Sequence, residues 1–258
     1  LAHLLPGHRE VADAAHRAEV AALWGVRKLP ATPGKAAVQM FEAAADGQIR
    51  ALWIVCTNPA HSMPDQTLVR RALERCEFVV LQEAYAHTAT ARCADLLLPA
   101  ASWGEKEGSV TNSERRISRV RAAVPPPGEA RADWAIAVDV ARRLETRLPS
   151  RRAAGLEGTS LFPFDGPEAI WLEHRESTRG RDLDITGLTW SALDTPTQWP
   201  CPAQASASAP GAAPRDADRP EGDEAGTQAP TLAGSQKGLP RLYTDGRFAT
   251  PDGRARFQ

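Results

Sequence analysis

The fold is decided by residues 51–116. This stretch opens with ALWIVCTNPAHSMPD and, from residue 78, continues as FVVLQEAYAHTATARCADLLLPAASWGEKEGSVTNSERR. Apolar runs at residues 52–56, 78–81 and 94–99 have the length of strands, and each ends where polar or turn-forming residues begin. Strands of parallel sheets are buried on both faces and read as continuous apolar runs. The stretch therefore predicts an α/β fold with a mainly parallel, dinucleotide-binding-like sheet flanked by helices.

Helical patterns alternate with these predicted strands. Apolar residues at helical spacing predict a helix over residues 36–45 before the first strand and another over residues 66–75 before the second. A third, amphipathic helix is predicted over residues 133–144. Further helices are expected over residues 10–24 and 167–175, the latter within a C-terminal part that reads as irregular. Such alternation of helices and strands is typical of parallel sheets.

Polar residues follow the first two predicted strands where each one ends. Asn58 comes after the first strand, and Gln82 and Glu83 come directly after the second. Ligands bind at the carboxyl ends of parallel strands, so these residues predict a site for a large ligand, and a carboxylate there suits a ribose or a guanine edge. The alternatives are an Asn58 that caps its own turn and a Glu83 that is merely solvated. Asp133, at the start of a predicted helix, is either a cap or a further ligand contact.

A dense polar stretch, residues 104–116, follows the third predicted strand and reads as a loop. Lys106 suits a phosphate or a base carbonyl, and Arg116 suits a phosphate. Thr111 and Asn112 offer hydrogen-bond donors and acceptors. A solvated, charged loop is the alternative interpretation of the whole stretch.

The composition excludes several classes of protein. A chain of 258 residues can bury a sizeable core, and its net charge of −1 provides no basic excess for a nucleic-acid partner. The apolar runs are too short to span a membrane. The four cysteines lack C-x-x-C spacing, which favours free thiols in a reducing compartment over a metal cluster. We therefore expect a soluble, cytoplasmic protein.

Three motifs carry a resemblance to a known family. They are WIVCTNPAHSMPD at residues 53–65, ADLLLPAASWGEKEGSVTNSERR at residues 94–116 and RLYTDGRFATPDGRARF at residues 241–257. Together they resemble the molybdopterin oxidoreductase family, and the block E-K-E-G-x-x-T-N-x-E-R-R is quite specific to it. LLPGHR at residues 4–9 and the stretch RGR…TGLTW…QWPCP at residues 179–202 are similar to the branch that reduces nitrate.

The resemblance implies a bis(molybdopterin guanine dinucleotide) molybdenum cofactor, of which this chain would hold one guanine dinucleotide arm. It assigns cofactor contacts to Asn58, Gln82, Glu83, Lys106 and Asp133, although the family more commonly has Asp where Glu83 stands. It also implies a two-electron reduction of nitrate to nitrite, with electrons from ferredoxin, flavodoxin or an NADH-linked subunit. The metal and the pterin carry that chemistry, so no catalytic residue or metal ligand is assigned within this chain.

The same resemblance divides the chain into three parts. Residues 1–202 correspond to a dinucleotide-binding part, and residues 241–258 to the start of a C-terminal molybdopterin-dinucleotide-binding domain. Residues 203–240, rich in Ala, Pro, Gly and Ser, read as a flexible insertion. The chain begins with Leu1 and has no leader, so we expect a fragment whose [4Fe–4S] motif lies outside it.

Three other interpretations remain open at this point. One is a formate dehydrogenase-type subunit of the same superfamily. Another is a subunit, similar to one in respiratory complexes, that keeps the fold without the cofactor. The third is a structural or interaction module. Thr111, Asn112 and Arg116 are correspondingly open, since their motif serves either the cofactor or the structure of the loop.

Overall fold

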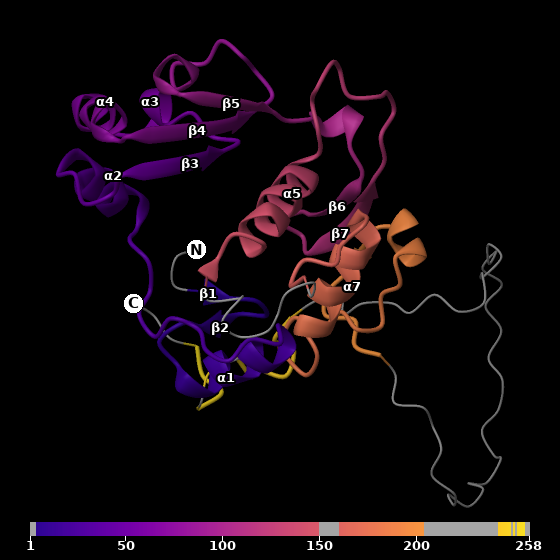
Figure 1. Ribbon diagram of the computed structural model, residues 1–258. Helices are drawn as coiled ribbons and strands as arrows, with labels where there is room; N and C mark the ends of the chain where they lie inside the picture. Colours follow the sequence, from indigo (N-terminus) through magenta and orange to yellow (C-terminus); the bar gives the residue numbers. More distant parts are fainter. Residues whose placement is uncertain (1–3, 150–159, 204–241, 249, 251, 256–258) are drawn as a thin grey trace, which may run out of the picture.

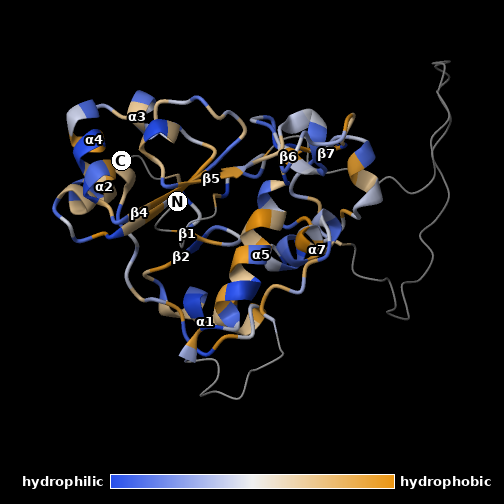
Figure 2. Cartoon of the chain, turned by 45° about the horizontal axis from the view of Figure 1, so that its top comes forward, coloured by the Kyte–Doolittle hydropathy of each residue, from blue (hydrophilic) through white to orange (hydrophobic). Residues whose placement is uncertain are grey.

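A three-stranded parallel sheet organises the first half of the computed structural model, which describes residues 4–149, 160–203, 242–248, 250 and 252–255 (Figure 1). Its strands are β3 (Ala51–Val55), β4 (Phe78–Glu83) and β5 (Leu96–Pro99), in the order β3-β4-β5. The α/β class and the parallel pairing predicted from the sequence are therefore confirmed. Figure 2 shows the apolar character of β4 and β5, as expected for strands in a parallel sheet.

One face of this sheet is covered by α2 (Ala37–Ala45) and α4 (Gln66–Arg75). Helix α4 begins where the Asp65 carboxylate accepts a hydrogen bond from the backbone of Leu68, at 2.9 Å. The core between helices and sheet consists of ten buried residues: Phe41, Ala44, Leu52, Ile54, Ala60, Val69, Ala72, Leu73, Val79 and Leu81. Burial of each large aliphatic side chain contributes about 1.5–3 kcal/mol. Helix α4 belongs to the connection from β3 to β4, whereas α2 precedes β3 in the chain, and both helices pack on this face.

The sequence-based prediction of a loop over residues 104–116 was wrong. The chain there forms an antiparallel hairpin of β6 (Gly108–Thr111) and β7 (Arg116–Val120), which pairs further with β8 (Thr197–Gln198). Burial of Ile117 against an aromatic cluster explains the difference, because the residues that bury it lie more than 50 positions later in the chain. That cluster contains Trp171, Ile185, Leu188, Trp190, Leu193 and Cys201.

The remaining helices agree with the sequence pattern except at one end. Helix α5 (Asp133–Glu145) and α7 (Pro167–Ser177) lie where amphipathic and proline signals predicted them. Helix α1 (Ala14–Leu23) starts four residues later than expected. Asp13 caps it by accepting hydrogen bonds from two backbone amides, and the preceding residues include the short strand β2 (Arg9–Glu10), paired with β1 (Leu4–Leu5).

Arg9 joins this N-terminal segment to the end of α7. Its buried guanidinium donates to the carbonyls of Pro6, at 3.0 Å, and Ser177, at 2.6 Å. It also donates to the Glu19 carboxylate, at 2.7 Å. Gly7 has a φ of +69°, and a Cβ there would lie 2.7 Å from the Ser177 carbonyl oxygen. Only glycine therefore fits this turn.

Within the described residues, no helix has the length and apolar character needed to cross a membrane. The predicted insertion at residues 203–240 lies outside the described residues except for Ala203. The three-part division of the chain accordingly stays a prediction.

Candidate functional site

Four side chains from separate segments meet at the carboxyl end of the parallel sheet. Cys56 directly follows β3, and Gln82 lies near the end of β4. Lys106 follows the short 3-10 helix η2 (Trp103–Glu105), and Asp133 is the first residue of α5. Parallel strands bring these positions together because their carboxyl ends share one edge of the sheet.

Asp133 is the centre of the group. Its carboxylate accepts hydrogen bonds from Lys106 Nζ at 2.5 Å, Gln82 Nε2 at 2.8 Å and Cys56 Sγ at 3.0 Å. The capping alternative was wrong, because Ala132 is the N-cap of α5 and no side chain caps this helix. Instead, the carboxylate is in the first helical turn, where the helix dipole favours a negative charge.

The network sets the protonation of its members. Burial raises the pKa of Asp133, but hydrogen bonds from Lys106, Cys56 and Gln82 outweigh burial and leave the pKa below its usual value. Burial, together with the hydrogen bond to Asp133, raises the pKa of the Cys56 thiol to about 11. At neutral pH the thiol therefore keeps its proton and acts as a donor to an ionised carboxylate.

The side-chain oxygen of Gln82, Oε1, has no hydrogen-bond donor among the described residues. Its side chain is only 1% exposed, and its Nε2 is used by Asp133. Its Oε1 is buried and accepts a hydrogen bond from none of the described residues. Such an acceptor costs about 1–3 kcal/mol until a donor such as a water molecule or a ligand N–H group reaches it.

Asn58, in the loop after β3, has a structural partner of its own. Its Oδ1 accepts from the Thr90 backbone at 3.1 Å and from the Thr90 hydroxyl at 2.7 Å. That hydroxyl accepts from the Ala60 backbone, at 3.1 Å. The Asn58 side chain thus ties the loop after β3 to the loop after β4. Glu83, half-buried at the end of β4, accepts from the backbone of Ala84 at 2.7 Å.

Thr111, Asn112 and Arg116 belong to the β6–β7 hairpin and are exposed. Asn112 Oδ1 accepts from the backbones of Glu114, at 3.0 Å, and Arg116, at 2.9 Å, an arrangement that shapes the turn. The Arg116 guanidinium pairs with Glu114 at 3.2 Å. Asn112 and Arg116 thus make these contacts within the hairpin, whereas Gln82, Lys106 and Asp133 share one network.

Sequence reasoning missed three contributors. Cys56 ends the first strand and was available to the same strand-end logic that selected Asn58, but it was interpreted only as a free thiol. Thr90 lies in a run of small residues that was interpreted only as allowing a close approach of the backbone to a ligand or to the sheet. Trp103 is exposed, and its ring lies 5.2 Å from Lys106 Nζ. A cation–π contact of this kind fixes the direction of the lysine side chain.

The sequence of this chain matches the model of a known protein family. The model of the family described as "Molybdopterin oxidoreductase" matches residues 6–143, a range that includes Cys56, Gln82, Lys106 and Asp133.

Several curated relatives are similar to the chain. A nitrate reductase from Synechocystis sp. is 39% identical over 261 residues, which covers 100% of this chain and 31% of the relative. The assimilatory nitrate reductase catalytic subunit from Bacillus subtilis is 37% identical over 77% of this chain and 26% of the relative. Formate dehydrogenase H from Escherichia coli is 32% identical over 76% of this chain and 25% of its own length.

The chain spans only a quarter to a third of the length of these relatives. Among solved structures, acetylene hydratase from Pelobacter acetylenicus matches with a TM-score of 0.46 and 22% identity, over 61% of this chain and 19% of that one.

Proposed function

The chain belongs to the molybdopterin oxidoreductase family, and we propose that it is part of the catalytic subunit of a molybdenum-dependent nitrate reductase. In this proposal, the group around Asp133 binds the guanine dinucleotide arm of a bis(molybdopterin guanine dinucleotide) cofactor. When bound, the cofactor supplies the two-electron chemistry that converts nitrate to nitrite. The residues of this chain supply binding and orientation.

The buried Oε1 of Gln82 is the observation that carries the proposal. It is an acceptor without a donor among the described residues, next to the ionised carboxylate of Asp133. A guanine edge offers adjacent N–H donors, and such an edge suits an acceptor pair of one amide oxygen and one carboxylate. The residues present therefore fit a guanine nucleotide.

The other members of the group take complementary roles. Lys106 supplies a positive charge for a phosphate or a base carbonyl, and Trp103 and Asp133 orient it. Asn58 contributes its side-chain amide, while its Oδ1 holds the loop in place. Glu83 adds a second carboxylate beside Asp133 at the carboxyl end of the sheet. Thr111, Asn112 and Arg116 contribute through the hairpin that follows Lys106.

Nitrate is the proposed substrate because of the similarity to nitrate reductases over the whole chain. Formate is the second candidate, supported by the 32% identity with formate dehydrogenase H. We further propose an assimilatory, cytoplasmic enzyme that receives electrons from ferredoxin, flavodoxin or an NADH-linked subunit. Its [4Fe–4S] cluster and its molybdenum ligand would belong to other parts of the complete polypeptide.

Purification of the complete polypeptide provides the first test. We expect molybdenum and guanine nucleotide to copurify with it, and we expect nitrate to oxidise a reduced viologen dye in its presence. Formate-dependent reduction of the dye, without activity on nitrate, would favour the second candidate. Protein that carries neither molybdenum nor guanine nucleotide would refute both.

The cofactor site is tested separately by Lys106→Ala. We expect this variant to lower the guanine nucleotide released per polypeptide, because the positive charge beside Asp133 is lost. Lys28→Ala, at an exposed position in a loop, is the matched control and should leave the content unchanged. Equal nucleotide content in the two variants would contradict the role of Lys106.

A further inference from the structure

The carboxylate of Asp133 has few acceptor positions left for a ligand. An ionised carboxylate offers about four, two on each oxygen. Oδ1 accepts from Gln82 Nε2 at 2.8 Å and from Cys56 Sγ at 3.0 Å, so both of its positions are used. Oδ2 accepts from Lys106 Nζ at 2.5 Å and keeps one position open among the described residues. Without the Cys56 thiol, a position on Oδ1 would be open as well.

The second open acceptor is Oε1 of Gln82, which is buried and accepts from none of the described residues. A carboxylate only accepts hydrogen bonds, so the amide nitrogen of Gln82 faces Asp133 and Oε1 is left for another donor. The side chain is 1% exposed, which keeps this oxygen away from bulk water. The buried acceptor is independent of Cys56, and it marks a place where a donor is missing.

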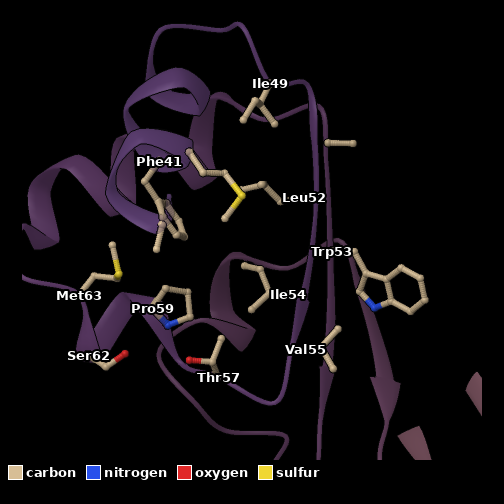
Figure 3. Close-up of a pocket in the computed structure, with 13 residues that line it drawn as sticks. Phe41, Ile49, Leu52, Trp53, Ile54, Val55, Thr57, Pro59, Ser62 and Met63 are labelled. Carbon is tan, nitrogen blue, oxygen red and sulfur yellow. The ribbon is translucent and has the colours of Figure 1, made fainter. Parts of the chain in front are cut away.

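The backbone of Cys56 departs from the alternation of β3. Figure 3 shows Leu52 and Ile54 pointing from β3 towards Phe41, on the side of the sheet that the helices cover. Alternation along the strand would send the Cys56 side chain to that same side. Its φ of +51° interrupts the alternation, and its Sγ is hydrogen-bonded to Asp133 instead.

Asp133 lies towards the other face of the sheet. Leu81 of β4 is buried in the core with α2 and α4, so the next residue, Gln82, points to the opposite face, where it contacts Asp133. The positive φ carries the Cys56 thiol to this side, and the Cys56 amide donates to the Gln82 carbonyl at 2.8 Å. A φ in this range is uncommon for residues other than glycine, and such residues are concentrated at functional sites.

We propose that Cys56 is a positioning residue for the bound nucleotide: its thiol fills the second position of Asp133 Oδ1, which leaves the ligand only Asp133 Oδ2 and Gln82 Oε1. The ligand class that fits this pair of acceptors carries two neighbouring N–H donors, as the edge of guanine does. The inference rests on the proposed function, because it requires that the nucleotide binds at this network. It adds a residue that acts on the nucleotide through Asp133.

The thiol also helps to keep Asp133 ionised. Lys106, after η2, and Cys56, after β3, are the titratable groups that donate to this carboxylate, while Gln82 of β4 is neutral. Glu83 adds a negative charge near Cys56. Burial raises the pKa of Asp133, and the hydrogen bonds to its carboxylate lower that pKa by more. Loss of the thiol would raise the pKa of Asp133, so protonation would remove the acceptors at a higher pH.

Retention of guanine nucleotide by the complete protein at different pH values tests the inference. Samples are held at values from about pH 7 to about pH 4 and desalted, and the nucleotide left per polypeptide is measured after acid hydrolysis. We expect the pH of half-release to be about 0.5–1 unit higher in Cys56→Ala than in the wild type. Cys56→Ser keeps a donor and should return this pH to the wild-type value.

Cys93→Ala is the matched control, because it removes a half-buried thiol in the 3-10 helix η1 (Ala91–Cys93) and should leave the pH of half-release unchanged. Equal profiles for the wild type and Cys56→Ala, or an equal shift in Cys93→Ala, would overturn the inference and leave the proposed function standing. A wild-type protein without guanine nucleotide would refute the proposed function, and the inference with it.

Circular dichroism of the same samples separates positioning from folding. We expect Cys56→Ala to remain folded at the pH where it releases the nucleotide, and release that coincides with its unfolding would overturn the inference. If Cys56→Ala does not fold, Cys56→Gly replaces it, since glycine adopts a positive φ freely. Glycine also lacks the donor, so the same shift is expected, and a wild-type profile in this variant would count against the role of the thiol.

Discussion

The contact between Lys106 and Asp133 offers a quantitative test of how the candidate site is held together. A double-mutant cycle would combine Lys106→Met, which keeps the aliphatic stem, with Asp133→Asn, which keeps the shape. The introduced asparagine would still accept from Gln82 and Cys56 through its Oδ1. Its amide nitrogen would face Lys106, so this variant removes the charged contact and keeps the other two hydrogen bonds.

The expected coupling energy follows from the geometry. The contact is 2.5 Å long, and the two side chains are 22% and 29% exposed. A hydrogen bond between charged groups contributes about 1.5–3 kcal/mol when it is shielded, and an exposed ion pair contributes about 0–1 kcal/mol. For this intermediate exposure, we expect a coupling of about 1–2 kcal/mol.

Urea unfolding of the four proteins, followed by circular dichroism, measures this coupling. Each substitution alone should also lower stability, Asp133→Asn more than Lys106→Met, because a neutral amide oxygen is also a weaker acceptor for Gln82 and Cys56 than the carboxylate is. A coupling energy below about 0.5 kcal/mol would refute the reasoning, since that value is typical of a fully exposed pair. The control cycle pairs Asp133→Asn with Arg50→Met, at the opposite end of β3, and an equal coupling there would indicate a non-specific charge effect.

Three further predictions concern the same region. The pKa of Asp133 is lowered in the folded protein, so its stabilising contribution is present above the unfolded pKa of about 3.9 and is lost as pH falls through the folded value. The difference in urea midpoint between the wild type and Asp133→Asn should therefore stay constant above about pH 5 and shrink below it. With a pKa of about 11, Cys56 should react with iodoacetamide at pH 8 about a hundredfold more slowly than a free thiol, despite its exposure. The substitution Asp133→Asn should speed this reaction. A rate equal to that of free cysteine would contradict the prediction. Thr90→Val should cost about 1–3 kcal/mol in urea unfolding, because Thr90 is fully buried and its loss leaves the Ala60 amide unpaired, whereas Thr88→Val at a half-buried position should cost less.

The parallel sheet was predictable because the sequence features that mark it lie within its strands and in the turns directly after them. The runs that became β3, β4 and β5 are apolar and short, and each ends at a turn signal, so the type of element and its direction followed from the sequence. Gln82 and Lys106 were selected for a related reason: the chain order of an α/β fold already brings strand ends together. Asp133 was assigned to the cofactor by the family resemblance. The resemblance of the motifs then added the identity of the family.

The second sheet was not predictable because its partners are distant. Arg116 pairs in register with Gln198, and the burial of Ile117 depends on tryptophans at positions 171 and 190. The charge density of residues 104–116 favoured a loop over the short strand β6 and the start of β7. Cys56 was missed for a related reason, since its role depends on Asp133, which lies 77 residues later in the chain.

The Arg9 contacts have a consequence for the order in which the chain matures during synthesis. The carbonyl of Ser177 accepts from Arg9 across a separation of 168 residues. At about 5–20 residues per second, the ribosome takes roughly 8–34 s to deliver Ser177 after Arg9 has been made. The β3-β4-β5 sheet is complete within residues 51–99 and has its partners much earlier. Until then, the nascent N-terminal segment has only the local partners of Arg9, the Pro6 carbonyl and the Glu19 carboxylate, and it gains its contact with α7 last.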